Sequence, residues 1–289
     1  MAKAYMQTTY SICLILLLGF LIPPVEAAAS ISLEETVSVA VPLCDSDTCP
    51  QETLTLPSWS PNPDELILVT VAVRRPSRKV TVSGNGLTFV EIANVDNIQN
   101  NSGIHLFRAM GAVPSSGSIT VSFTDLENNP IRTYAAATAT RFSGVDTGGT
   151  NGSGAVEATA TDPGPASDND DMKVNVTTVS DNAWTLAGGT YRTKRFEDSE
   201  LPGSQTLIVK DLFGGDGGDK VALSTWYQEV TSGGTTLAMG ADNDVSGATD
   251  WCIAAVSLKP SGAVLPDPDP DPDPDPDPDP DPDPDPDPS

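Results

Sequence analysis

The sequence predicts an all-β protein, an antiparallel β-sandwich of about a dozen short strands with a disordered Pro-Asp tail. Three observations lead to this prediction. Short segments in which apolar and polar residues alternate follow one another along most of the chain. Gly-, Asp- and Pro-rich turns separate these segments. Almost no segment has the helical period, which excludes a parallel α/β sheet and leaves an antiparallel sandwich or barrel.

The most apolar strand is predicted at residues 66–73, with the sequence LILVTVAV. The run is uncharged and rich in β-branched side chains. Turn signals flank it, Asn-Pro-Asp at 62–64 and Arg-Arg-Pro at 74–76. An uncharged run of this length between turn signals is typical of a strand buried on both faces. We therefore expect the rest of the sandwich to be built around this strand.

The remaining strands follow from the same alternation. Before the apolar run, strands are predicted at residues 37–41 and 54–56. The Gly-Asn-Gly sequence at 84–86 is a tight-turn signal that leads into the predicted strand at residues 87–92. After the apolar run, strands are predicted at residues 80–82, 87–92, 104–110, 119–123, 134–142, 156–161, 172–176, 183–191, 206–212, 221–230 and 251–258.

The last predicted strand, residues 251–258, is apolar on both faces. Alternation places Cys252, Ala254, Val256 and Leu258 on one face, whereas Trp251, Ile253 and Ala255 take the other. Because both faces are apolar, we expect this strand to be a partner of the strand at 66–73.

Residues 1–27 have the layout of a secretory signal peptide. Lys3 precedes the apolar run at 12–22, and two prolines and small residues follow, with cleavage expected after Ala27 or Ala29. The apolar run is shorter than the roughly 20 residues that span a bilayer, although an uncleaved anchor is the alternative. The mature protein is therefore expected to be secreted or held at the cell surface, with no insertion into the membrane after cleavage. Residues 28–262 form one predicted β-sandwich domain.

Residues 263–289 form an acidic low-complexity tail with a strict Pro-Asp alternation from Pro266 onward. Proline favours the polyproline II conformation and the aspartates repel one another, so the tail is expected to be a stiff spacer. Either the chain ends in a charged brush, or the spacer leads to another module.

The charge balance excludes two classes of partner. The chain has 15 basic and 40 acidic residues and a formal net charge of −25. The tail supplies 11 of the aspartates, and the predicted domain keeps a strong acidic excess. Such a surface repels nucleic acid and anionic lipid, so neither is an expected partner.

The cysteines and the single histidine bound the chemistry further. Cys44 and Cys49 lie close in sequence in an exported chain and are predicted to form a local disulfide. Cys252 lies at an inward strand position and is expected to be a buried, inert thiol. His105 is the only histidine, which argues against a zinc site. It lies between Ile104 and Leu106, so a sheet histidine with a satisfied partner is expected rather than a general base.

Four short passages resemble a widespread family of exported or virion-associated β-sandwich domains, found in bacterial surface proteins and phage structural proteins. They are Phe142 to Thr147 (FSGVDT) with the Gly-rich loop after it, the closing WCIAAVSLKP at 251–260, SGNGLTF at 83–89, and FRAMG at 107–111. The resemblance implies a jelly-roll-like sandwich that serves as a surface or binding module. It implies no active site.

No catalytic constellation is visible. The chain contains neither a Gly-x-Ser-x-Gly elbow nor a phosphate-binding Walker loop. Glu197, Asp198 and Glu200 form an acidic cluster beside Pro202-Gly203, which is read as a solvated loop rather than a pair of glycosidase carboxylates.

Two kinds of binding site can be suggested from residue type. Asp242, Asp244 and Asp250 supply hard oxygens in a loop that contains a glycine, as a structural calcium ion requires, and this is the only cofactor suggested. The acidic loop at 168–171 is a second candidate. For a sugar, an exposed aromatic ring is the usual stacking surface, and Trp59 and Trp226 are the candidates, with Tyr227 beside the latter. Packing in the core is the alternative for each ring. Asn100, Asn151 and Asn175 fit the glycosylation pattern.

The sequence therefore predicts an exported, non-enzymatic module with a structural or adhesive role at the cell surface or outside the cell. A carbohydrate-binding module is one alternative, and a self-assembling subunit of an extracellular filament or coat is another. The corresponding partners are a glycan, another surface protein, or a second copy of the chain.

Overall fold

The computed structural model describes residues 30–42, 50–74, 78–97, 102–164, 172–191, 203–215, 220–241 and 251–262. Within these residues the chain forms 16 β-strands and no helix, and all strand pairs are antiparallel. The predicted all-β antiparallel class is confirmed. The described elements accordingly include no helix that is long and apolar enough to cross a membrane. The predicted signal peptide and the Pro-Asp tail lie outside the described residues.

The strands form four sheets. The first central sheet has the order β1 (Ser32–Ala40), β9 (Ala135–Ser143), β3 (Leu66–Arg74), β7 (Ser102–Ala109), β6 (Val90–Asn97). The second central sheet has the order β10 (Val156–Asp162), β16 (Trp251–Leu258), β12 (Trp184–Tyr191), β14 (Val221–Glu229), β13 (Thr206–Gly214). The first outer sheet contains β2 (Thr53–Thr55), β8 (Ile119–Thr124), β4 (Lys79–Gly84) and β5 (Leu87–Thr88). The second outer sheet contains β11 (Met172–Thr177) and β15 (Thr236–Ala241).

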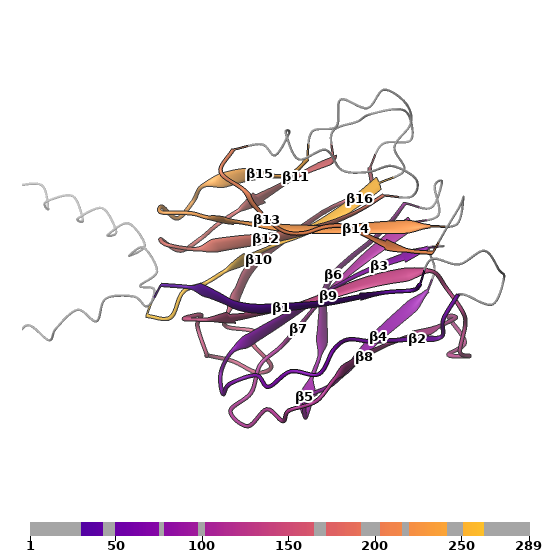
Figure 1. Cartoon of the computed structure of the whole chain (residues 1–289). Coiled ribbons are helices and arrows are strands. Elements are labelled where there is room, and N and C mark those ends of the chain that lie inside the picture. Colours follow the sequence, from indigo (N-terminus) through magenta and orange to yellow (C-terminus); the bar gives the residue numbers. More distant parts are fainter. Residues whose placement is uncertain are drawn as a thin grey trace, which may run out of the picture.

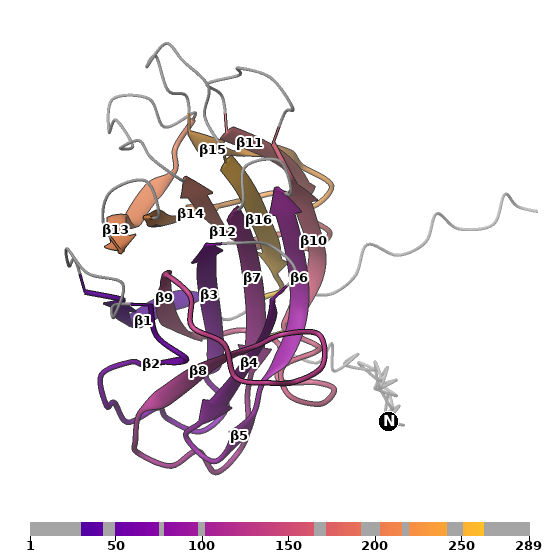
Figure 2. The same cartoon turned by 90° about the vertical axis from the view of Figure 1, so that its right-hand side faces the viewer.

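The four sheets are stacked in layers, with the two central sheets in the middle (Figure 1). β11 and β15 lie at the top of that view, and β2, β4, β5 and β8 lie at the bottom. After a 90° turn, β3, β7 and β6 of the first central sheet lie side by side, as their pairing requires (Figure 2). This arrangement is a sandwich with an extra sheet on each side. The jelly-roll-like connectivity remains a prediction.

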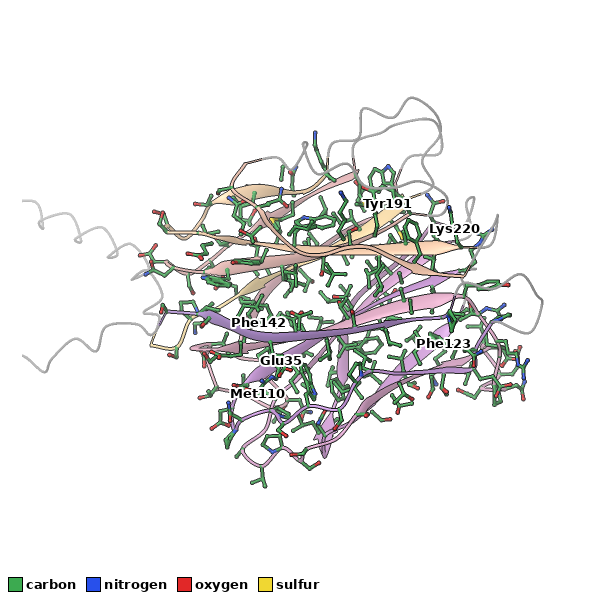
Figure 3. The ribbon with its side chains drawn as sticks, in the orientation of Figure 1. Glu35, Met110, Phe123, Phe142, Tyr191 and Lys220 are labelled. Carbon is green, nitrogen blue, oxygen red and sulfur yellow. The ribbon has the colours of Figure 1, made fainter. Side chains whose placement is uncertain are left out.

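Apolar side chains fill all three interfaces between the layers. Figure 3 labels one large side chain from each interface, Tyr191 in the upper part of the view and Phe142 and Phe123 below it. From the first outer sheet to the second, examples are Val71, Phe107, Val121 and Phe123, then Leu66, Leu68, Phe142 and Val256, then Met172, Tyr191, Trp226 and Met239. Each interface excludes water from the faces of two sheets, which is the main favourable term in folding.

Strand β3 is buried on both faces over its whole length, as predicted. Its odd-numbered residues, such as Val69 and Val71, pack toward the first outer sheet, whereas Leu66 and Leu68 pack toward the second central sheet. Two-sided burial of an antiparallel strand is unusual, because such sheets commonly leave one face in water. Here it follows from the layering, since a central sheet is covered by another sheet on each side.

The expectation that residues 251–258 pair with the strand at 66–73 is wrong. β3 pairs with β7 and β9, whereas β16 pairs with β10 and β12 in the other central sheet. The two strands belong to facing layers, and Leu66 and Leu68 share an apolar cluster with Val256 and Leu258. An apolar strand needs cover on its faces, and a strand in the opposite sheet provides that cover without pairing with it.

The alternation predicted within residues 251–258 is confirmed. Cys252, Ala254, Val256 and Leu258 face the first central sheet. Trp251, Ile253 and Ala255 face the second outer sheet.

The predicted tight turn at 84–86 is also confirmed. Asn85 and Gly86 have φ angles of 51° and 67°, and Gly84 pairs with Leu87 across the turn. Two consecutive residues with positive φ are the requirement of a type I′ hairpin, which Asn-Gly satisfies. The hairpin joins β4 to β5 in the first outer sheet. Strand β15 was not predicted, although Leu237, Met239 and Ala241 alternate along it.

Every edge strand of the two central sheets carries a β-bulge. The pairing shifts within residues 33–35 of β1, 91–93 of β6 and 156–158 of β10, and twice in β13. The ladders among the inner strands of both sheets have no shift. Bulges twist an edge and break its regular hydrogen-bonding row, which hinders the addition of another strand.

Candidate functional site

Trp59 is buried, although it lies in a Pro- and Ser-rich segment. Its main chain bridges to Gly117, and its indole Nε1 donates a 3.0 Å hydrogen bond to Asn85 Oδ1. The guanidinium of Arg141 lies 5.3 Å from the ring centroid, and the side chain belongs to the core beneath the first outer sheet. Only 5% of Trp59 is exposed. This burial corrects the expectation of an exposed stacking surface, because the ring faces are occupied by the protein itself.

Trp226 is fully buried between the second central and second outer sheets. Trp226 is therefore packed in the core and does not offer an exposed stacking surface for a sugar. Its neighbour Tyr227 points to the opposite face of β14, as strand alternation requires, and is half-buried. The Tyr227 ring stacks on Trp184 with centroids 4.8 Å apart and an interplanar angle of 6°. Both rings are partly exposed. Tyr227 was named from the sequence as a candidate beside Trp226, whereas Trp184 was not.

Several predicted sites fall on residues that the structure does not describe. They are the calcium ligands Asp242, Asp244 and Asp250, the acidic cluster at 197–200, and the disulfide pair Cys44 and Cys49. These predictions stand as they were made. Within the described ranges, no group of three or more His, Cys, Asp or Glu side chains is placed to hold a metal ion.

His105 lies on β7 and points toward the first outer sheet. Its Nδ1 is 2.7 Å from Glu91 Oε1, and its ring stacks on Phe107 with centroids 6.5 Å apart. The Nε2 atom is buried with no hydrogen-bond partner among the described residues. Because no hydroxyl or thiol contacts Nε2 there, the arrangement is that of a fixed sheet histidine rather than of a base beside a nucleophile.

Cys252 is a free, fully buried thiol, as predicted. Burial raises the pKa of the Cys252 thiol far above its usual value, with a further small contribution from the nearby Asp96 carboxylate. A thiol with a raised pKa carries almost no thiolate at neutral pH, so it is a poor nucleophile and a poor metal ligand.

Sequence reasoning missed a buried ionic cluster around Arg141. The guanidinium donates to Glu65 Oε2 at 2.5 Å, to Glu35 Oε2 at 2.6 Å and to the Ser60 carbonyl at 3.2 Å. Glu65 also accepts two hydrogen bonds from Asn62. Because these polar groups are paired with each other, the cluster holds the segment that carries Trp59 in place.

A groove of about 450 Å³ runs between the edge strands β6 and β10, where the two central sheets meet. Three charged side chains line it, and each is already engaged. Glu91 holds His105, Arg108 Nε donates to the Asn151 carbonyl, and Glu157 accepts from Ser257 and from two backbone amides after β11. The rest of the lining is Val90, Ile92, Val156, Ala158 and Thr159. The charged groups of the groove therefore hold the fold together.

A second, smaller pocket of about 270 Å³ lies at the end of β12 and β14. Trp184 lines it together with Glu229, Asn182 and Thr231, and the start of the described chain, Ser30 and Ile31, closes one side. Trp184 already stacks on Tyr227 and packs edge-on against Phe142. The aromatic faces in this pocket are thus largely used within the protein.

The outer face of the first outer sheet is a regular array of hydroxyl groups. In one row Thr53, Ser122 and Thr81 are paired across three strands. In the next row Thr55, Thr120, Ser83 and Thr88 are paired across four. These side chains are exposed or half-buried, and Lys79 is the only charged residue at an outward position of the strands. Neighbouring strands lie about 4.8 Å apart, and residues on one face of a strand repeat every ~6.8 Å.

This hydroxyl face is unusual in so acidic a protein. The chain carries 40 acidic residues, yet the outward positions of β2, β4, β5 and β8 carry no carboxylate. Neutral hydroxyls donate and accept hydrogen bonds, and their desolvation is far less costly than that of ions. The face can therefore contact a neutral partner that itself offers hydroxyl or amide groups.

Comparisons with protein-family models, with curated proteins and with solved structures found no match.

Proposed function

We propose that this protein is an exported, non-enzymatic module that makes structural or adhesive contacts at the cell surface or outside the cell. The observation that carries the proposal is the hydroxyl face of the first outer sheet, a regularly spaced face whose outward strand positions carry no carboxylate. The strands beneath it are anchored by a core that includes Val121 and Phe123, so the array is held on a rigid support.

The engagement of the polar side chains supports a non-catalytic role. His105, Arg141 and the carboxylates of the groove at β6 and β10 each have a partner within the fold. Export follows from the layout of residues 1–27, and the resemblance to surface and virion-associated sandwich domains agrees with it.

Carbohydrate binding is the second candidate, and the same hydroxyl face favours it. A neutral polysaccharide offers hydroxyl groups that can bond to both rows without bringing a charge close to the acidic body. If the protein binds carbohydrate, the contact surface is the hydroxyl face around Ser122 rather than Trp59 or Trp226.

Assembly into a filament by edge-to-edge strand addition is a weaker candidate, because a bulge interrupts every edge of the central sheets. A structural calcium ion in the loop with Asp242, Asp244 and Asp250 remains compatible with all three roles.

The experiment measures binding of the purified mature protein to intact cells and to a panel of neutral polysaccharides. Thr81→Glu combined with Ser122→Glu places two carboxylates in the middle of the hydroxyl face. We expect this variant to lose binding at least tenfold, whereas its melting temperature stays within roughly 5 °C of the parent, because both sites lie on the outer face and only the repulsion between the two paired carboxylates opposes folding. Asn175→Glu on the outer face of β11 is the matched control and should bind like the parent.

The binding target separates the two candidates. Loss of polysaccharide binding by the double variant identifies a carbohydrate-binding module, whereas loss of cell binding alone identifies contact with another surface component. Unchanged binding by the double variant would contradict the proposal. Release of new reducing ends from a bound polysaccharide would contradict the non-enzymatic role.

A further inference from the structure

The two halves of the chain repeat one strand order. In the first central sheet the order is β1-β9-β3-β7-β6, and in the second it is β10-β16-β12-β14-β13. When the hairpin strands β4 and β5 are not counted, each half has seven described strands, which can be numbered along the chain from first to seventh. In these numbers the order of both central sheets is first, seventh, third, fifth, fourth. The outer sheets agree, because β2 with β8 and β11 with β15 are each the second strand paired with the sixth.

The hairpin of β4 and β5 is the one described element that breaks the repeat. It lies between β3 and β6, and its counterpart would lie between β12 and β13. Residues 192–202 occupy that position and lie outside the described residues.

The registers also agree at matched positions, apart from a second bulge in β13 that β6 lacks. Leu66 begins β3 opposite Phe142 of β9, and Trp184 begins β12 opposite Leu258 of β16. With these positions matched, the bulge at residues 33–35 of β1 and the bulge at 156–158 of β10 coincide, because they lie opposite Phe142 and Leu258 respectively.

The bulges on the other edge coincide in the same way. Residues 91–93 of β6 shift opposite Phe107, which pairs with Val69 of β3. Residues 207–209 of β13 shift opposite Trp226, which pairs with the equivalent residue of β12, Ala187. Bulges are local features that pairing alone does not require. Their agreement in two places is therefore independent of the agreement in strand order.

A third irregularity repeats before β3 and β12. Asp64, two residues before β3, has a φ of 60°, and Asn182, two residues before β12, has a φ of 55°. Positive φ is uncommon for residues other than glycine, and Asp and Asn are the types that adopt it most readily.

The contacts between the two central sheets show how the halves are related. β6 lies against β10, and β1 lies against β13; likewise β7 contacts β16, and β9 contacts β14. When each strand is replaced by its counterpart in the other half, the contact between β6 and β10 becomes the contact between β13 and β1. In the same way the contact between β7 and β16 becomes the contact between β14 and β9. A two-fold axis between the halves produces this relation, as in a symmetric dimer.

Equivalent residues meet at the axis. Thr70 of β3 and Gly188 of β12 occupy matched positions, and they face each other across the interface. A Cβ atom on Gly188 would lie 2.4 Å from Cγ2 of Thr70 and 3.3 Å from Cδ1 of Ile104. Only one of the two axial positions therefore has room for a side chain.

We propose that the chain consists of two copies of one unit, residues 30–143 and 153–258, that share seven strands and dock on each other as a covalently linked pseudo-dimer, the first copy carrying the added β4–β5 hairpin. The inner face of each central sheet is the docking surface, and its partner is the same face of the other unit. The axial Thr and Gly break the symmetry, so the interface accepts two different copies but not two copies with Thr at this position.

The ends of the units support this proposal. The backbone amide of Ser261 donates a 2.8 Å hydrogen bond to the Gly144 carbonyl, and a Cβ on Gly144 would lie 2.2 Å from the Ser30 carbonyl oxygen. The start of the first unit, its end and the end of the second unit thus lie together. The segment that links the units therefore needs only to lead from the end of the first unit back to this region, where the second unit begins.

The first experiment exchanges the two axial residues in the full chain. Gly188→Thr alone should lower the melting temperature by roughly 5–10 °C, or prevent folding, because two threonines overfill the axis. The exchange variant, Thr70→Gly with Gly188→Thr, should return to within roughly 3 °C of the parent, since under the two-fold relation either unit can supply the Thr. An exchange variant that is no more stable than Gly188→Thr would overturn the proposal.

Gly189→Ala is the matched control. Gly189 follows Gly188 but faces the second outer sheet, where its Cβ would meet Met172. Thr70→Gly should not offset its effect, and the two changes should be additive. Rescue of Gly189→Ala by Thr70→Gly would show a general loosening of the core and would contradict the assignment of the axis.

A circular permutant tests the equivalence of the units directly. New termini lie within residues 145–153, and a short Gly-Ser linker joins residue 262 to residue 30, so the second unit is synthesised first. We expect a folded protein with one unfolding transition, within roughly 5 °C of a parent that lacks the tail. A permutant that does not fold would mean that the halves are not self-contained units, and the proposal would fail.

Discussion

At the scale of single residues, the buried polar groups are where local chemistry decides stability. Arg141 is 8% exposed and neutralises the buried Glu65 carboxylate while its guanidinium covers the ring of Trp59. Removal of one partner from a buried ion pair leaves an uncompensated charge, which is much more costly than the loss of a surface pair.

We therefore expect Arg141→Met to lower the free energy of unfolding by about 3 kcal/mol. Arg132→Met is the matched control, because Arg132 makes an exposed, 3.6 Å pair with Glu52, and its loss should change stability by less than about 0.5 kcal/mol. Urea denaturation of both variants measures the difference. Equal effects of the two changes would show that the Arg141 cluster is not a buried clamp.

The thiols provide a second test at this scale. Because Cys252 is fully buried and its thiol pKa is raised by burial, no thiol of the folded mature protein should react with Ellman's reagent at pH 8. In urea one thiol should react if Cys44 and Cys49 are joined, and three should react after reduction. Rapid reaction of one thiol in the folded protein, when only one reacts in urea without reduction, would contradict the burial of Cys252. Three reactive thiols in urea without reduction would contradict the disulfide.

At the scale of elements, alternation in the sequence was sufficient to find most strands but not their partners. The faces of β16 could be assigned residue by residue, since successive side chains of a strand point to opposite faces. The strands that pair with β16 could not be predicted, because apolar residues on both faces indicate burial but do not indicate which strand lies alongside. The same limit applies to Trp59. Its sequence neighbours are turn-forming residues, and its burial depends on Asn85, Gly117 and Arg141, all distant in sequence.

The segment between the two halves is fixed by an ion pair with a predictable pH dependence. Lys259 Nζ lies 2.8 Å from Asp146 Oδ2, and Asp146 Oδ1 accepts a hydrogen bond from the Gly148 amide. The hydrogen bond from Lys259, followed by that from Gly148, lowers the pKa of Asp146. A lowered pKa means that this contribution is complete above the unfolded-state pKa of about 3.9 and is lost as the pH falls through the folded-state value.

Asp146→Asn should therefore reduce stability by roughly 1 kcal/mol or less at pH 7, with the difference from the parent shrinking as the pH falls through the lowered folded-state pKa of Asp146. Thermal unfolding from pH 7 to pH 2.5 measures this. A difference that persists at the lowest pH would show that the carboxylate charge is not responsible.

At the scale of the whole molecule, the sequence predicted the all-β class but not the layering. The period-two pattern cannot distinguish a two-layer sandwich from four stacked sheets, because both place alternate side chains inside. Strands that are apolar on both faces, such as β3 and β16, were the signal that more than two layers are present. The pseudo-two-fold relation was also hidden. Matched positions such as Thr70 and Gly188 differ in residue type, whereas the features that repeat are bulges and strand order, which only the structure reveals.

Hydrogen exchange followed by mass spectrometry tests the layered core most directly. The account predicts that peptides covering β3 and β9 in one central sheet, and β12 and β16 in the other, exchange last and at similar rates, since both sheets are covered on both faces. Peptides from β2 and β11 in the outer sheets should exchange earlier. If peptides of either central sheet exchanged as fast as those of the outer sheets, that sheet would lack cover on one side and the four-layer arrangement would be contradicted.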